Sequence, residues 1–217
     1  MDLTQFSPSS ALITVVLLAL APYAAVMVTS FTKIVVVLSL LRNALGLQQV
    51  PPNVVLNGLA LVLSVYVMYP VGQQMAERAA GVPNAYTSTS GMLAAADAAK
   101  EPLREFMVKH AQPRERAFFL KTAQKALPAD KAAALTDRDF IVIVPAFTVT
   151  ELATAFQIGF LIFLPFLVVD LIVSNILMAM GMMMLSPTTV SLPFKLLLFV
   201  LIDGWVKLTH GLVLTYQ

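Results

Sequence analysis

Five ionisable residues stand alone in the otherwise uncharged and largely apolar stretch from residue 151 to residue 207: Glu151, Asp170, Lys195, Asp203 and Lys207. A charge in an apolar segment of this length is costly unless it faces protein, water or an opposite charge. Such groups could form ion pairs or carry protons and cations along a polar path. The pattern therefore indicates the wall of a membrane-associated assembly rather than a simple anchor.

Asp170 and Asp203 lie in the same apolar stretch, and two intramembrane aspartates can in principle form a proteolytic dyad. Neither aspartate lies in a Gly-x-Gly-Asp motif, and the sequence contains no Gly-x-Ser-x-Gly, His-Glu-x-x-His or phosphate-binding glycine loop. Cysteine is absent, and His110 and His210 have no second ligand four residues away. We therefore expect no enzyme activity, no metal and no cofactor.

A small-solute or ion transporter is the alternative, because Glu151 and Asp170 could carry protons or cations through a helical bundle. The chain has only 217 residues and no obvious inverted repeat. A transporter of this kind would need several copies of the chain to enclose a path.

Composition and charge distribution divide the chain into three regions. The mean hydropathy is +0.83 and only 12% of the residues are charged, about half the share in a soluble domain. Three charges lie in residues 1–72, eighteen in 73–139 and five in 140–217. We expect an N-terminal apolar helical block (1–72), a polar insert (73–139) and a C-terminal apolar helical hairpin (140–217). The interleaved charges and the net charge of +2 argue against a nucleic-acid partner.

The first block predicts a broken helix or a helical hairpin followed by a second apolar helix. Residues 11–32 are uncharged and long enough to cross about 30 Å of hydrocarbon at roughly 1.5 Å per residue. Pro22 should kink this helix, and the apolar pattern continues to Arg42. Gly46 and the two consecutive prolines at 51–52 mark a turn. The next apolar segment, 54–71, should end near Pro70.

Small residues recur four positions apart in three apolar segments. Such spacing lets helix backbones approach closely, although alanine-rich helices also produce it by chance. The pairs are Ala21 with Ala25, Ala60 with Ser64, and Ala155 with Gly159.

The insert is expected to hold a loop at 81–91 and two amphipathic helices, in which apolar residues recur at 103, 106 and 107 and again at 119, 120, 123 and 127. Lys33 and Arg42 flank the first connection, so the positive-inside rule places that connection in the cytoplasm and the insert in the periplasm.

The third block is expected to begin a helix at Thr148, because Thr148 to Glu151 match a capping box. A capping role is the structural alternative for Glu151. Pro165 should bend the helix, and the turn signal at 186–189 predicts a hairpin.

Two long strings resemble the FliP/SctR family, the R component of the type III secretion export apparatus in its flagellar and virulence forms. They are TSFTKIVVVLSLLRNALGLQQVPPNVVLNGLALVL, residues 29–63, and the segment from PAFTVTEL to LIDGW, residues 145–205. The resemblance, closer to the virulence branch, implies an all-α fold of bent helical hairpins that assemble into an oligomeric helical cone in the bacterial inner membrane and project into the periplasm.

The resemblance also implies partners and site residues. Five copies are expected with S-type and T-type partners, further U-type and V-type export components, a surrounding membrane ring, and unfolded secreted proteins as substrates. Met182, Met183 and Met184 are similar to a methionine gasket that closes the pore. Glu151 and Lys195 are similar to an ion pair between neighbouring subunits. Methionine is flexible and polarizable, which suits a deformable gate, although methionines also simply fill apolar helices.

Overall fold

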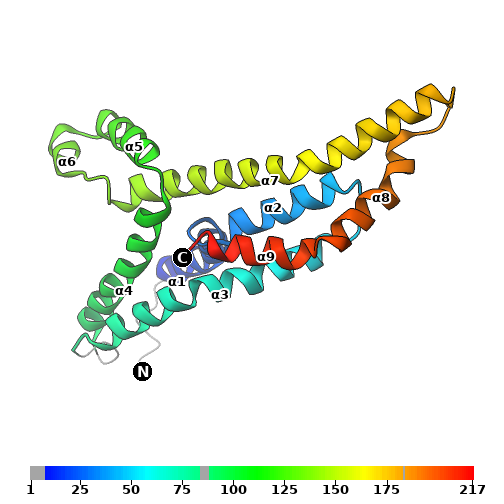
Figure 1. Ribbon diagram of the computed structural model, residues 1–217. Coiled ribbons are helices and arrows are strands. Elements are labelled where there is room, and N and C mark those ends of the chain that lie inside the picture. Colours follow the sequence, from blue (N-terminus) through cyan, green and yellow to red (C-terminus); the bar gives the residue numbers. More distant parts are fainter. Residues whose placement is uncertain (1–7, 84–87, 183) are drawn as a thin grey trace.

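The structure is a computed structural model that describes residues 8–83, 88–182 and 184–217. Every regular element in these residues is a helix, so the predicted all-α class is confirmed (Figure 1). The helices are α1 (Pro8–Met27), α2 (Phe31–Ala44), α3 (Asn53–Ala80), α4 (Thr89–His110), α5 (Pro113–Ala126), α6 (Ala129–Ala134), α7 (Phe140–Ala179), α8 (Pro187–Leu201) and α9 (Gly204–Leu214).

The first apolar block is broken as predicted. α1 ends at Met27 and α2 begins at Phe31, and Pro22 lies inside α1. α2 ends in a tight turn in which the amide of Leu47 bonds to the carbonyl of Arg42 at 3.2 Å. Gly46 adopts φ 78° there, a conformation that glycine reaches without strain.

α3 and α7 are both longer than predicted. α3 runs for 28 residues through Pro70, and α7 runs for 40 residues through two prolines. The residue four positions before each of these prolines is exposed, so the carbonyl that loses its donor is free to tilt outward. These residues are Tyr66, Ile141 and Leu161. In Figure 1, α7 is a single long, gently curved helix.

The predicted capping box at Thr148 is wrong. α7 begins at Phe140 with Asp139 as its N-cap, so Thr148 and Glu151 lie inside the helix. The Thr148 hydroxyl donates to the carbonyl of Val144 one turn earlier, at 2.9 Å. Helix formation extends back to residue 140 because Ile143 and its neighbours are fully buried against α4, and this packing outweighs the local signals.

The C-terminal block begins with a helical hairpin. α7 and α8 pack together and join through residues 180–186 at the end of the molecule farthest from the insert (Figure 1). α8 and α9 are bent by 60° relative to each other at Ile202 and Asp203.

α2 forms the centre of the apolar core, because α3 and α7 pack on it and α9 closes the same cluster. Its fully buried face consists of Ile34, Val37, Leu38 and Leu41. Within the described residues, α3 and α7 are long and apolar enough to cross a membrane, and the bent pair of α8 and α9 would make a third span.

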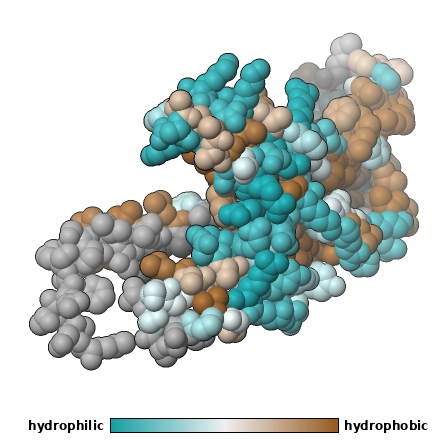
Figure 2. All heavy atoms as spheres, turned by 90° about the vertical axis from the view of Figure 1, so that its left-hand side faces the viewer, coloured by the Kyte–Doolittle hydropathy of each residue, from teal (hydrophilic) through white to brown (hydrophobic). Residues whose placement is uncertain are grey.

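The insert forms the polar end of the molecule. α4 packs against α3 and α7, α5 packs on α7, and Figure 2 shows hydrophilic side chains gathered on this end face. Its loop is shorter than predicted, because Ser88 accepts a hydrogen bond from the amide of Gly91 and α4 begins at Thr89.

The small-residue spacing marks real helix contacts in two of the three segments. Ala60 and Ala155 are fully buried, and the Ser30 hydroxyl donates to that of Ser64 at 3.0 Å. Gly159 faces Leu40 of α2. Ala25, in the first segment, is exposed.

We predict that Gly159→Ala separates α2 from α7. A Cβ atom at residue 159 would lie 2.2 Å from Leu40 Cδ1 and 3.0 Å from Leu40 Cβ, so side chain and backbone must shift, at a cost of about 1 to 3 kcal/mol. The matched control is Gly58→Ala in α3, where nothing lies within 4 Å and the change should stabilise by up to about 1 kcal/mol. Thermal unfolding in detergent checks both, and equal effects would contradict the close helix contact.

Candidate functional site

Glu151 lies in a buried ion pair that links α7 to α2. Lys33 Nζ is 3.3 Å from Glu151 Oε1, and the two side chains are only 4% and 2% exposed. The hydroxyl of Tyr216 donates a hydrogen bond to the second carboxylate oxygen, Oε2. The charge buried in the core is therefore matched inside the chain, as its cost requires.

Tyr216 brings the segment after α9 into the same cluster. Its ring lies beneath Lys33, with Nζ 3.6 Å from the ring centroid, and it stacks on Phe106 of α4 at 5.9 Å. His110 packs edge-on against the ring at 5.1 Å. The cluster thus joins α2, α4, α7 and the residues beyond α9.

His110 is a packed residue with little tendency to carry charge. Its ring also contacts Phe106 at 4.7 Å. Burial lowers its pKa from 6.5 to about 4, and the nearby charges of Lys33 and Lys109 act in the same direction. Among the residues that the structure describes, no three His, Cys, Asp or Glu side chains gather in a way that could hold a metal.

Lys195 of α8 lies in a second group of polar contacts, which we call the Lys195–Asp170 node. Lys195 Nζ is 2.6 Å from Asp170 Oδ2 on α7 and donates to the carbonyl of Ala44 at 3.3 Å. The Ser191 hydroxyl donates to the other oxygen of Asp170 at 2.5 Å. Because Ala44 is the last residue of α2, the cation also lies at the negative end of the helix dipole. This node attaches the α7–α8 hairpin to the core.

The structure does not bring Glu151 and Lys195 together within one chain. Glu151 bonds to Lys33, and Lys195 bonds to Asp170. The predicted ion pair concerns a neighbouring subunit, so it stays a prediction. Lys33, which sequence reasoning used only for orientation, had a usable signal: it is a cation inside the uncharged apolar run of the first block, just as Glu151 is an anion inside that of the third.

The methionines predicted to form the gate lie at the tip of the α7–α8 hairpin. Met184 is 98% exposed and Met182 is 41% exposed, whereas Met183 lies outside the described residues. Gly181, with φ 73°, turns the chain at the end of α7. Apolar side chains such as Ile176 and Phe194 line a hollow directly behind the tip.

Asp203 and Lys207 differ from the other three charges of the C-terminal block. Both are exposed, and neither forms an ion pair with any described residue. Asp203 lies at the break before α9 with φ 53°, and its side chain does not cap the helix.

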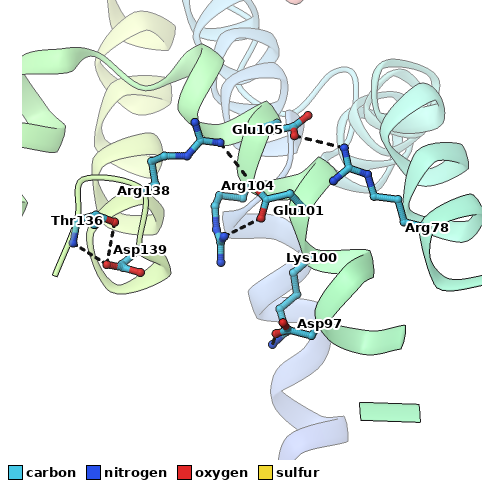
Figure 3. A network of polar contacts seen from close by, with 9 residues as sticks. All are labelled: Arg78, Asp97, Lys100, Glu101, Arg104, Glu105, Thr136, Arg138 and Asp139. Atoms are coloured by element: carbon cyan, nitrogen blue, oxygen red, sulfur yellow. Dashed lines mark hydrogen bonds and ion pairs between the residues drawn. The ribbon is translucent and has the colours of Figure 1, made fainter. Parts of the chain in front are cut away.

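A network of exposed and half-buried ion pairs crosses the insert (Figure 3). Glu101 pairs with Arg104 at 2.6 Å and with Arg138 at 3.4 Å, while Arg78 pairs with Glu105 at 3.3 Å. Solvent-exposed pairs contribute little individually, but together these link α3, α4 and the segment before α7.

Comparisons with known proteins agree over almost the whole chain. The profile of the FliP family matches residues 13–212. The chain is 54% identical to the "Hypersensitivity response secretion protein HrcR" of Ralstonia nicotianae, over 96% of this chain and 97% of that protein. It is 52% identical to the "Yop proteins translocation protein R" of Yersinia pestis, over 92% of both chains. It is also 48% identical to the "Virulence protein YscR" of Salmonella typhimurium, over 87% of both.

We predict that Lys33→Met destabilises the chain by about 3 to 5 kcal/mol, because the carboxylate of Glu151 would stay buried without its cation. The matched control is Lys100→Met, which removes a pair with Asp97 whose side chains are 52% and 81% exposed and should cost less than about 1 kcal/mol. Thermal unfolding of the detergent-solubilised chain measures both. Similar losses of stability in the two variants would show that the buried pair contributes no more to folding than an exposed pair.

Proposed function

Because the chain belongs to the FliP family, we propose that it is a core subunit of the export gate of a type III secretion system, through which unfolded proteins cross the bacterial inner membrane. Relatives named for secretion and translocation match nearly all of the chain, which supports this assignment. The observation that best supports a role in the pore is that exposed methionines occupy the tip of the largely apolar α7–α8 hairpin.

The surface of the chain supports assembly with other subunits. Large apolar side chains are exposed along both α3 and α7, among them Val54, Tyr66, Phe160 and Leu161. Surfaces of this kind need lipid or protein partners. We assign them to neighbouring copies, five in total, and to S-type and T-type export proteins, with U-type and V-type components and a membrane ring around the assembly.

The polar insert fits the periplasmic side in this proposal. Its hydrophilic residues gather at one end of the molecule, opposite the hairpin tip (Figures 1 and 2). α3 and α7, with 28 and 40 residues, are long and apolar enough to cross a membrane core, which supports our assignment of the chain to the inner membrane as a multi-pass protein.

The gate acts through the properties of methionine. In a ring of copies, hairpin tips would converge and their methionines would form an apolar constriction that excludes water. Thioether side chains are unbranched and flexible, so they could adapt to a passing polypeptide of any sequence. The ion pair between Lys195 and Asp170 would set the angle at which each α7–α8 hairpin points toward the central axis of the ring.

The transporter alternative finds less support. It needs acidic side chains free to carry protons or cations, whereas Glu151 accepts bonds from Lys33 and Tyr216, and Asp170 accepts bonds from Lys195 and Ser191. Both acids serve to hold helices together.

The pore proposal predicts that the triple variant Met182→Ala, Met183→Ala and Met184→Ala leaks ions at rest while the complex still forms. Shorter side chains would widen the constriction. Met182 and Met184 lie between α7 and α8 and are exposed, so truncating them removes no packing from the core of the chain. Ion leakage and complex yield are measured in the same cells. The control is Met92→Ala, an exposed methionine of the insert, which should add no leak. A normal complex without added leakage, or a collapsed complex, would reject the gate assignment.

The proposed pair between Glu151 and the neighbouring subunit's Lys195 competes with the pair inside the chain, and two charge swaps separate them. Glu151→Lys alone should abolish assembly, because it places two cations together in the core. If the pair between subunits dominates, adding Lys195→Glu restores assembly and secretion. If the pair within the chain dominates, adding Lys33→Glu restores them instead. Recovery with only the second combination would remove Glu151 from the subunit interface.

A further inference from the structure

Tyr216, in the segment after α9, is where the polar insert meets the end of that helix. Its ring stacks on Phe106 of α4 at 5.9 Å and contacts His110 edge-on at 5.1 Å. Beside it, Lys109 of α4 donates a hydrogen bond to the backbone carbonyl of Gln217 at 3.2 Å. In Figure 1, the chain beyond α9 points toward α4. The insert therefore holds the end of α9 in place.

α9 is attached to the core by few side chains. Gly204 and Leu212 are its buried residues, and the remaining side chains of the helix are half-buried or exposed. By contrast, α2 and α7 share the buried ion pair of Lys33 and Glu151. Elements with few buried contacts open most easily in a folded protein. A displacement of the insert would therefore move α9 more readily than it would move α2 or α7.

Tyr216 follows α9 in such a movement, because its backbone amide bonds to the carbonyl of Val213 in the last turn of the helix, at 3.1 Å. Its side chain also contacts the core. The hydroxyl donates to Glu151, and Lys33 Nζ lies 3.6 Å from the centroid of the ring. Breaking a buried contact of this kind costs more than making it contributes. The ring thus has one favoured position between the insert and the core.

The bend between α8 and α9 is closely packed. A Cβ atom at Gly204 would lie 2.1 Å from Phe199 Cε2, and the rings of Phe199 and Trp205 meet edge-on at 5.5 Å. Phe199 also lies 6.3 Å from Phe166 of α7, measured between ring centroids. Closely packed interiors transmit a displacement instead of absorbing it. A movement of α9 would therefore reach α8, which carries Lys195 and leads to the hairpin tip.

We propose that Tyr216 is a positioning residue that couples the insert to α8. The insert sets where the end of α9 lies, and the packed bend passes that position to the α7–α8 hairpin. The consequence for export rests on the proposed gate, in which α8 would widen or narrow the constriction. The coupling itself is a property of the single chain and can be measured without export.

The chain has a single tryptophan, Trp205, which reports on the bend. His110→Ala removes a contact between the insert and the Tyr216 ring, and Phe118→Ala, at a 59% exposed residue of the insert, is the control. Hydrogen exchange of α9 and acrylamide quenching of Trp205 are measured on full-length chains in detergent. His110→Ala should speed exchange in α9 about tenfold, within the usual range of coupling between sites, and should raise the quenching. Phe118→Ala should change neither.

Variants of Tyr216 show whether its ring carries the effect. Tyr216→Leu breaks both aromatic contacts with the insert, so α9 should already exchange fast and His110→Ala should add nothing. Tyr216→Phe keeps the ring and should keep the response to His110→Ala. Equal increments from His110→Ala in the wild-type and Tyr216→Leu backgrounds would overturn the proposal. A loss of thermal stability in Tyr216→Leu without any change in α9 would reduce the residue to a structural role and would also overturn it.

The test does not depend on whether Tyr216→Leu folds. A His110→Ala chain in which α9 and Trp205 behave as in the wild type refutes the coupling by itself. In assembled complexes, Tyr216→Leu should leak ions at rest. Faster exchange in α9 without leakage would support the coupling and contradict the proposed gate, so the two failures are distinguishable.

Discussion

The buried ion pair between Lys33 and Glu151 is the interaction on which the arrangement of the helices depends. Both charges lie in apolar surroundings, where each one alone would be costly. Their pairing therefore fixes α2 against α7 in one register, and Tyr216 adds the segment after α9 to the same point. Apolar packing between helices tolerates sliding, whereas a matched pair of buried charges does not.

The same principle organises the other end of the molecule. Lys195 and Asp170 join α8 to α7, and the contact of Lys195 with the carbonyl of Ala44 anchors both helices to the end of α2. Beyond this node the hairpin carries mainly exposed apolar residues and ends in the methionine tip. In the proposed export gate, the polar nodes provide the rigid frame, and the flexible thioether side chains provide the part that deforms.

Sequence reasoning predicted the features that depend on local pattern. The break before α2, the turn at Gly46, the polar insert and the C-terminal hairpin all follow from apolar periodicity and from proline or glycine. It failed where tertiary packing outweighs local signals: α7 continues back through Pro145, so the apparent capping box at Thr148 lies inside a helix. It also identified Glu151 and Lys195 as important but not their partners within the chain, because Lys33 and Tyr216 lie 118 and 65 residues away from Glu151.

The central claim is that secreted proteins pass the hairpin tip, and cross-linking to a trapped substrate tests it most directly. The chain contains no cysteine, so a single Met184→Cys substitution gives a unique thiol at the exposed tip. A secreted protein that carries one cysteine and is stalled in transit should form a disulfide with residue 184. A thiol introduced at Lys121, on the exposed face of the insert, should form none. A stalled substrate that never cross-links to residue 184, in complexes that contain both proteins, would contradict the account.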